Sequence, residues 1–367
     1  MAKLIRARDL GLGFPGTTGE HNALTDVPGI LVGFATISEG EGALVVGQGP
    51  IRTGVTAILP TGRGTGMVPV WAGFHALNGN GEMTGTHWIQ DAGYFVGPIC
   101  ITNTHSVGIA HHAATKWMIR TNPAFHEHHV WAMPVVAETY DGLLNDINGQ
   151  HVRESHVFTA LDTACEGPIA EGNVGGGTGM ICYEFKGGTG TSSRRILIDG
   201  TAYTVGALVQ ANHGVRDWLT ILGVPVGKHL TEDRLSMADC GSIIVIIGTD
   251  VPLLPNQLTR LAKRAAIGIG RHGTPGGNNS GDIFLAFSTA NRGPLHQFAP
   301  SHLTLRCIND ERLDNVYLAG VEAIEEAVIN ALVAARDTPT LRPPGKICRA
   351  IPRARLVEVM RAYNRCA

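Results

Sequence analysis

The amino-acid sequence predicts a layered α/β fold in which helices cover buried sheets. Short β-branched runs bounded by Gly, Pro, Asn or Asp recur from one end of the chain to the other. Several of these runs are apolar at nearly every position, which is typical of strands buried on both faces. Segments with a helical period lie between and after them. Doubly buried sheets with helices beside them indicate a layered architecture.

Eight segments have the composition and the boundaries of strands. The run Ser242-Ile-Ile-Val-Ile-Ile-Gly248 is the clearest, because β-branched residues follow one another without a polar interruption. The predicted strands are residues 29–36, 54–59, 97–102, 130–137, 179–185, 202–211, 242–248 and 282–288.

Three segments have the period of a helix. In 256–270, apolar residues recur at the i, i+3, i+4 and i+7 spacing of one core-facing stripe. The longest helix is expected at 313–336, with apolar residues toward the core and Glu322, Glu325 and Glu326 toward solvent. A final amphipathic helix is expected at 354–363, after the break at residues 343–345.

The bulk composition indicates a globular protein with one large core. Hydrophobic residues make up 44% of the 367 residues and charged residues 16%. No fixed-period repeat, low-complexity tract or long linker divides the sequence, so we expect a single compact domain over 1–367. The net charge is only -2, with 29 basic and 31 acidic residues and no long run of either sign. Nothing here predicts binding to nucleic acid or to an anionic membrane.

A cytoplasmic location is expected. The apolar runs are far shorter than the roughly 20 residues that span a bilayer. The first ten residues mix charges of both signs among apolar ones, unlike the continuous apolar region of a secretory signal. The 7 cysteines include no Cys-x-x-Cys pair, and we expect them to be reduced thiols.

Two patterns suggest a ligand but do not match a known ligand motif. The histidines at 105, 111, 112, 126, 128 and 129 match no zinc signature, so no metal site is predicted. The segment Gly172-Asn-Val-Gly-Gly-Gly-Thr-Gly179 suggests a phosphate cradle but lacks the Gly-Lys-Ser/Thr ending of a P-loop. A tight structural or pocket-lining loop is the favoured interpretation, and no cofactor is predicted.

The strongest candidate for chemistry is the sequence Asp239-Cys240-Gly241-Ser242 ahead of a buried strand. By pattern alone, this is commonly a turn that leads into a strand. The alternative is that the Ser242 hydroxyl attacks the Gly241 carbonyl, since glycine tolerates unusual dihedral angles. The freed α-amine, with an unperturbed pKa of about 7.7–8.0, would then be a proton acceptor beside the hydroxyl.

Three further segments carry polar groups at strand ends. Ser280 and Asp282 lie two residues apart in a turn, where a hydroxyl and a carboxylate could assist a nucleophile. Asn212 ends a predicted strand, and its amide could donate to an oxyanion. Glu138 and Tyr140 leave another buried strand, and the carboxylate could pair with a substrate ammonium. Each segment is also explained by ordinary turn or solvent-facing residues.

Taken together, these motifs closely resemble one family. It comprises the L-aminopeptidase/D-amino-acid esterase-amidase enzymes known as DmpA, with the related β-peptidyl aminopeptidases. The resemblance covers essentially the whole chain, and the motifs follow in the family's order. They are the segments at 8–19, 22–29, 172–180, 210–214, 241–245 and 280–282.

The resemblance implies a precursor cut between Gly241 and Ser242 into subunits 1–241 and 242–367. Ser242 would be the amino-terminal nucleophile, assisted by Ser280 and Asp282. Asp282 stands where the β-peptidyl enzymes have glutamate, which puts a preference for β-peptides in doubt. The implied fold is a four-layer αββα sandwich of the amino-terminal-nucleophile hydrolase type, with different connectivity.

The resemblance also assigns the substrate contacts. Asn212 and Tyr140 would stabilise the tetrahedral oxyanion, and Glu138 would bind the free amino group of a small peptide, amide or ester. Family members need no metal or organic cofactor and form homo-oligomers, typically tetramers of the processed pair.

Two alternatives stay open at this point. The same machinery would also suit β-peptides, oligoamides or D-amino-acid amides and esters. From a different class, an unprocessed protein could use the Gly-rich loops to bind a nucleotide.

Overall fold

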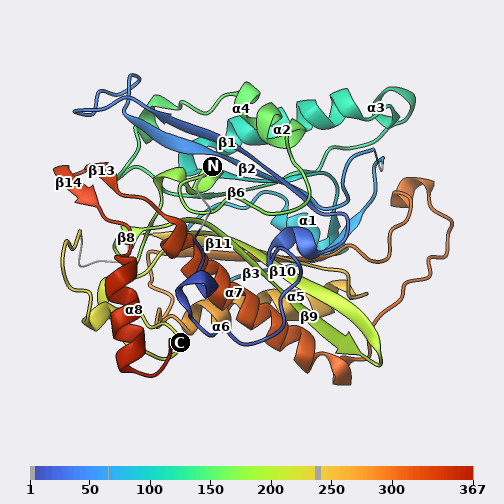
Figure 1. Cartoon of the computed structure of the whole chain (residues 1–367). Coiled ribbons are helices and arrows are strands. Elements are labelled where there is room, and N and C mark those ends of the chain that lie inside the picture. Colours follow the sequence, from blue (N-terminus) through green and yellow to red (C-terminus); the bar gives the residue numbers. More distant parts are fainter. Residues whose placement is uncertain (1–4, 65, 236–240, 367) are drawn as a thin grey trace.

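The computed structural model describes residues 5–64, 66–235 and 241–366, whose longer strands form two sheets (Figure 1). The four-stranded sheet has the order β1-β2-β5-β6, and the six-stranded sheet has the order β4-β3-β12-β11-β10-β9. The first contains β1 (Leu31–Glu39), β2 (Ile51–Leu59), β5 (Ile99–Asn103) and β6 (Val135–Thr139). The second contains β3 (Val70–Ala76), β4 (Tyr94–Phe95), β9 (Gly188–Ile198), β10 (Thr201–Asn212), β11 (Ser242–Thr249) and β12 (Gly281–Ser288).

The two sheets pack face to face through an apolar layer. Ile58 and Ile101 of the four-stranded sheet belong to one buried cluster with Leu208, Ile246 and other residues of the six-stranded sheet. Alternate residues of the same strands point to the opposite face, where they pack under helices. Because every position of β11 is buried, its composition is apolar on both faces.

Helices cover the outer face of each sheet, so the molecule has four layers (Figure 1). Helices α2 (Val107–Thr121) and α4 (Glu154–Asp162) cover the four-stranded sheet. Helices α5 (Pro255–Lys263), α6 (Ala265–Gly270) and α7 (Asp314–Ala334) cover the six-stranded sheet. This arrangement is the predicted αββα sandwich.

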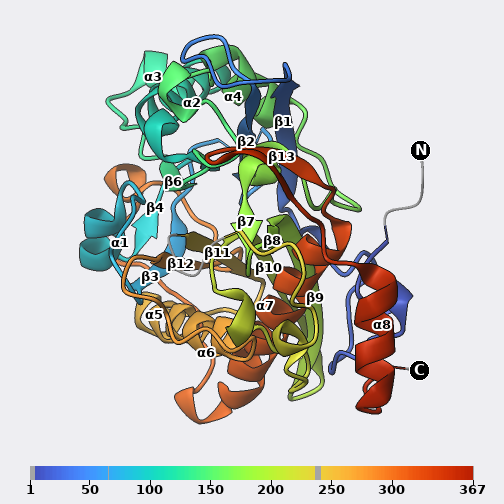
Figure 2. The same cartoon turned by 90° about the vertical axis from the view of Figure 1, so that its left-hand side faces the viewer.

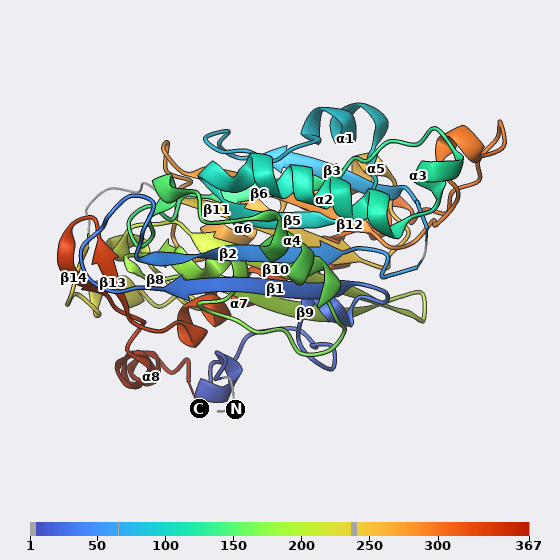
Figure 3. The same cartoon turned by 90° about the horizontal axis from the view of Figure 1, so that it is seen from above.

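Shorter elements lie at the edges of the sandwich. They are α1 (Thr86–Ala92), α3 (Ala124–Glu127), α8 (Arg353–Ala362) and the hairpins β7 (Ile181–Cys182) with β8 (Phe185–Lys186) and β13 (Thr338–Leu341) with β14 (Pro344–Cys348). The two hairpins lie close together at one end of the molecule (Figure 2, Figure 3). A backbone hydrogen bond of 2.7 Å from Lys186 N to Arg349 O joins them. No helix among the described residues is long and apolar enough to span a membrane.

Most predicted strands are confirmed, with shifted ends. The strand expected at 130–137 starts only at Val135, and the one expected at 179–185 is the short hairpin β7–β8. Strands β3 and β9 and helices α2 and α4 were missed. Strand β9 carries Thr, Ser and Arg at buried positions, so its composition does not show an apolar pattern.

The three predicted helices exist, and 256–270 is divided between α5 and α6. The expectation that Glu322, Glu325 and Glu326 of α7 face solvent is wrong, because all three are buried. Arginines from distant segments cover them: Arg194 lies 3.4 Å from Glu322, and Arg271 lies 2.7 Å from Glu325.

Glu326 is the centre of the most buried of these ion pairs. Its carboxylate accepts hydrogen bonds from Arg8 and Arg194, both at 2.8 Å, and from the Asn22 amide at 2.6 Å. Burial alone would raise the pKa of Glu326, but the two guanidinium groups outweigh burial and lower it. The carboxylate therefore ties the amino-terminal segment and β9 to α7.

We predict that Glu326→Ala destabilises the protein by about 3–5 kcal/mol, since it leaves the buried Arg194 guanidinium without this partner. Urea denaturation measures the free energy of unfolding. Glu358→Ala is the matched control, because its ion pair with Arg355 on α8 is exposed on both sides and contributes little. Equal losses in the two variants would contradict this role of Glu326.

Candidate active site

The pairing register of β11 fixes the neighbours of Ser242. Ser242 is opposite Asn212, the last residue of antiparallel β10, and opposite Gly281, the first residue of parallel β12. Opposed side chains of an antiparallel pair lie on the same face, with Cβ atoms about 4.5–5.5 Å apart. The Ser242 hydroxyl and the Asn212 amide are therefore neighbours at this end of the sheet.

The Ser242 hydroxyl lies against the preceding peptide. Its Oγ donates a hydrogen bond to the Gly241 carbonyl oxygen at 2.8 Å and accepts one from the Gly281 N–H at 3.1 Å. The residue is only 6% exposed. Such a hydroxyl is held beside the carbonyl that self-cleavage requires it to attack. The preceding Asp239 and Cys240 lie outside the described residues.

Gly241 is needed for close packing. A Cβ atom added to Gly241 would lie 1.6 Å from the Asn212 carbonyl oxygen, a backbone atom that cannot turn aside. The close approach of the Asn212 backbone is therefore one reason why this position requires glycine.

Asn212 is held by both ends of its amide. Its Oδ1 accepts a hydrogen bond from Ile181 N at 2.7 Å, and its Nδ2 donates to the Tyr140 carbonyl oxygen at 3.0 Å. Since an amide nitrogen carries two hydrogens, a second N–H remains to donate to a substrate. The contact also joins the end of β10 in one sheet to the residue that follows β6 in the other.

Tyr140 is the most exposed of the candidate residues, at 40%. Its ring meets the His105 ring edge-on, with centroids 6.4 Å apart. The phenol lies against Gly142, where an added Cβ atom would be 2.3 Å from the Tyr140 Oη. The phenolic hydroxyl therefore has one side open to solvent or substrate.

Glu138 is buried at the end of β6, at 3% exposure, so the solvent-facing alternative is wrong for this residue. Its carboxylate accepts hydrogen bonds from Glu82 N at 2.9 Å and from the Thr104 hydroxyl. Burial raises the pKa of Glu138 despite these bonds. A Cβ on Gly81 would lie 3.0 Å from Glu138 Oε1 and 3.8 Å from the Gly281 Cα, so Gly81 bridges this carboxylate and the neighbour of Ser242.

Ser280 and Asp282 form a pair on one turn. The Ser280 hydroxyl donates to Asp282 Oδ1 at 2.6 Å, and both residues are 1% exposed. Since side chains alternate along a strand and Ser242 pairs with Gly281, this pair lies on the opposite face from the Ser242 hydroxyl. Among the described residues, no hydrogen bond joins Ser280 to Ser242. The backbone nitrogen of Ser242 lies between the two faces.

A cavity of 240 Å³ lies beside Gly241, the residue that precedes Ser242. Tyr140, Asn212, Gly241 and Gly179 line one part of it, and residues of the β13–β14 hairpin line another. The Gly-rich segment 172–179 thus reaches the cavity at Gly179, while Gly176 packs between the two sheets, against Ile101 and Gln210. An added Cβ on Gly176 would lie 2.1 Å from Gln210 Oε1. The segment is thus both a tightly packed structural loop and a loop that lines a pocket.

Other residues near the site carried no local signal in the sequence. Asp141 is buried behind Tyr140, and burial raises its pKa to about 7. His213 follows Asn212 and lines the cavity; burial and then the nearby His272 lower its pKa to about 3, so the ring is neutral. The described residues contain no group of three His, Cys, Asp or Glu side chains that would hold a metal ion.

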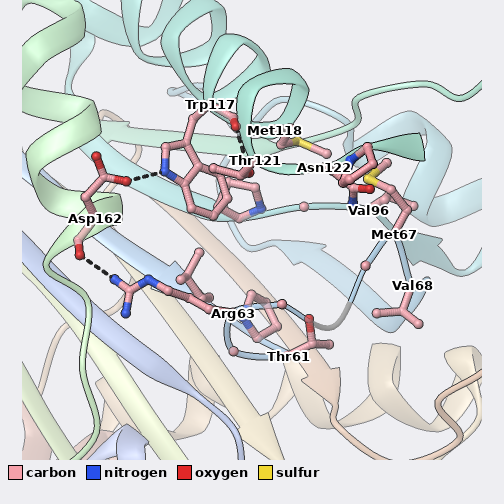
Figure 4. Close-up of a pocket in the computed structure, with 18 residues that line it drawn as sticks. Thr61, Arg63, Met67, Val68, Val96, Trp117, Met118, Thr121, Asn122 and Asp162 are labelled. Carbon is pink, nitrogen blue, oxygen red and sulfur yellow. Dashed lines mark hydrogen bonds between the residues drawn. The ribbon is translucent and has the colours of Figure 1, made fainter. Parts of the chain in front are cut away.

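A second cavity, of 420 Å³, lies away from this site, between the 59–68 segment and helices α2 and α4 (Figure 4). Its polar groups are occupied by structural contacts. Trp117 donates to Asp162 Oδ1 at 2.6 Å, and Arg63 donates to the carbonyl oxygens of Leu161, Asp162 and Ala164, each at 2.7 Å. None of the candidate catalytic residues lines it.

The chain is similar to characterised aminopeptidases over nearly its full length. It is 49% identical to the β-peptidyl aminopeptidase BapA of Sphingosinicella microcystinivorans, over 99% of this chain and 93% of the relative. The structure of the L-aminopeptidase D-Ala-esterase/amidase from Ochrobactrum anthropi, described as a new variant of the Ntn hydrolase fold, matches with a TM-score of 0.94. That match has 56% identity and covers 99% of both chains.

A third relative extends the comparison. The β-aminopeptidase of a Burkholderia species has 47% identity and a TM-score of 0.89, with 98% of this chain and 99% of that chain covered. The model of peptidase family S58 matches residues 22–343. The chain therefore belongs to peptidase family S58, and it is a hydrolase with an Ntn-type fold.

Proposed function

We propose that this protein is a self-processing serine aminopeptidase and amidase. The Gly241–Ser242 bond is cleaved to give chains 1–241 and 242–367, and Ser242 then hydrolyses small peptides, amides or esters that have a free amino group. The observation that carries the proposal is the position of the Ser242 hydroxyl, 2.8 Å from the Gly241 carbonyl oxygen and opposite Asn212. The activities named for the relatives agree with it.

Self-cleavage begins with attack of Ser242 Oγ on the Gly241 carbonyl carbon. The bond to the Ser242 nitrogen breaks, the hydroxyl proton passes to that nitrogen, and Gly241 is left as an ester on Oγ. Water hydrolyses the ester to a Gly241 carboxylate and restores the hydroxyl. The new α-amine is the base that accepts the hydroxyl proton in later turnovers.

In turnover, Ser242 Oγ attacks the first acyl carbon of the substrate. The developing oxyanion accepts hydrogen bonds from the Asn212 amide and the Tyr140 hydroxyl, and the acyl-enzyme is then hydrolysed by water. The Ser280–Asp282 pair lies on the face of the sheet opposite the Ser242 hydroxyl. We therefore infer that this pair orients the Ser242 α-amine and does not contact the hydroxyl directly. The buried carboxylate of Glu138 binds the substrate ammonium.

The class of amino acid released has two candidates. The match to the Ochrobactrum anthropi enzyme favours L-aminopeptidase with D-esterase and D-amidase activity. The similarity to the β-peptidyl enzyme of Sphingosinicella microcystinivorans favours β-peptides as well. A panel of L-, D- and β-alanine amides separates them. A cytoplasmic location stays part of the proposal; the six described cysteines are free thiols, as a reducing compartment keeps them.

We predict that the protein hydrolyses alanine p-nitroanilide and not its N-acetylated analogue, because the acetyl group removes the charge that Glu138 binds. Glu138→Gln should raise KM for the free-amine substrate about tenfold or more, the effect of losing one charge-assisted hydrogen bond. Glu154→Gln is the matched control, since this carboxylate pairs with Lys116 on the helices that cover the four-stranded sheet. Hydrolysis of the acetylated substrate at a similar rate would refute the role of Glu138.

We propose that the processed pair forms a homo-oligomer, as in the tetramers that the family resemblance implies. Large apolar side chains are exposed on two neighbouring segments: Trp131 at 55%, Phe298 at 47% and Leu303 at 46%. The His128 and Phe298 rings, 4.9 Å apart, hold the segments together. Light scattering should therefore give about four times the mass of one chain, and Trp131→Asp with Phe298→Asp should reduce it. A monomeric wild-type protein would exclude this assembly.

A further inference from the structure

The cavity beside Ser242 has a wall that the catalytic assignments do not use. Thr340, Arg342 and Pro343 of the β13–β14 hairpin line it together with Tyr140, Asn212 and Gly241. The hairpin lies at the end of the sandwich where β11 begins (Figure 3). The chemistry of its side chains therefore bears on whatever occupies the space next to the scissile bond.

Arg342 is fixed by the loop that follows β6. Leu341 N and Arg342 N both donate to the Leu143 carbonyl oxygen, at 2.9 and 3.2 Å. The Arg342 Nη1 donates to the carbonyl oxygen of Gly142, the residue against which the Tyr140 phenol packs. The guanidinium group and the proposed oxyanion donor Tyr140 thus contact the same glycine, so they lie close together.

The positive charge of Arg342 has no partner in the described part of the chain. Only Nη1 is hydrogen-bonded, to the backbone oxygens of Gly142 and Asn145, and no described carboxylate forms an ion pair with it. The buried Arg194, by contrast, is paired with Glu326. A half-buried cation that lines a cavity with Nη2 and Nε unused is suited to bind an anion.

Among the described residues that line this cavity, Glu184 carries the one other charged side chain. Its oxygens accept backbone hydrogen bonds from Arg216 N at 3.1 Å and Leu235 N at 3.0 Å. The buried Arg216 guanidinium is also an electrostatic partner of Glu184. These N–H groups and the Arg216 guanidinium therefore stabilise the negative charge of Glu184. No ion pair joins Glu184 to Arg342 in the described part of the chain.

Glu138 and Arg342 occupy different parts of the surroundings of Ser242. Glu138 contacts Gly81 beside Gly281 and does not line the cavity, whereas Arg342 lines it together with Gly241. The carboxylate of a one-residue leaving group is within about 3.5 Å, the length of one extended residue, of the scissile nitrogen. We propose that Arg342 binds the free carboxylate of the leaving residue, which makes dipeptides the preferred substrates. This inference rests on the proposed function.

The test compares L-alanyl-L-alanine with L-alanyl-L-alanine amide, which differ only in the terminal charge. Wild-type protein should have a KM for the free acid about tenfold to a hundredfold below that for the amide. Arg342→Gln should raise KM for the acid to that of the amide, with kcat and the amide kinetics little changed. Arg342→Lys should retain part of the preference, since it keeps the charge but not the planar fork.

Arg63→Gln is the matched control, because Arg63 also donates to backbone carbonyl oxygens but lines the other cavity (Figure 4). It should leave the acid-to-amide ratio unchanged. Equal KM values for acid and amide in wild-type protein would overturn the inference even if Arg342→Gln did not fold. If wild-type protein did not hydrolyse alanine p-nitroanilide, the proposed function would be refuted, and this inference with it. Equal effects of Arg342→Gln on acid and amide would show a structural role only.

Discussion

The site depends on one constraint, the register in which β11 pairs with both of its neighbours. Antiparallel pairing places Asn212 beside Ser242, and parallel pairing places the Gly281 N–H on the Ser242 hydroxyl. A slip of one residue would turn the serine to the opposite face of the sheet. The polar residues at the two ends of β11 favour this register, because the Ser242 hydroxyl accepts from the Gly281 N–H and the Thr249 hydroxyl donates to the Thr204 carbonyl oxygen.

The position of the Glu138 carboxylate near Ser242 follows from the stacking of the two sheets. Glu138 comes from the four-stranded sheet and Ser242 from the six-stranded sheet, and they meet where Gly81 and Gly281 leave no side chains between them. The Asn212 amide bonds the Tyr140 carbonyl across the same junction. If Glu138 binds the substrate ammonium and Arg342 the terminal carboxylate, as proposed, Ser242 would act on short substrates with two free ends. Exopeptidase specificity then needs no separate lid.

The apolar pattern of the sequence predicted most of the fold, because strands such as β11 and helices such as α7 show their burial directly. It failed where polar residues are buried in pairs. Glu326 was placed toward solvent because its partners, Arg8 and Arg194, are far away in the sequence. Strand β9 was missed for the same reason, since its buried Ser192 hydroxyl donates to a carbonyl oxygen of α7.

The candidate site was predictable only in part. Local patterns singled out Ser242, Asn212 and Glu138, but each had an ordinary turn or surface explanation, and the family resemblance was needed to join them. No local pattern singled out Arg342, because this residue reaches the cavity only when its hairpin folds back onto the loop after β6. Such long-range contacts have no counterpart in the spacing of residues along a chain.

The central claim is that Ser242 cleaves its own chain and becomes the nucleophile. Intact-mass spectrometry under denaturing conditions, on wild-type protein and on Ser242→Ala, tests it most directly. The account predicts two fragments with the masses of residues 1–241 and 242–367 in the wild type, and an uncut chain in the variant. A single 38.9 kDa chain in both samples would contradict the account.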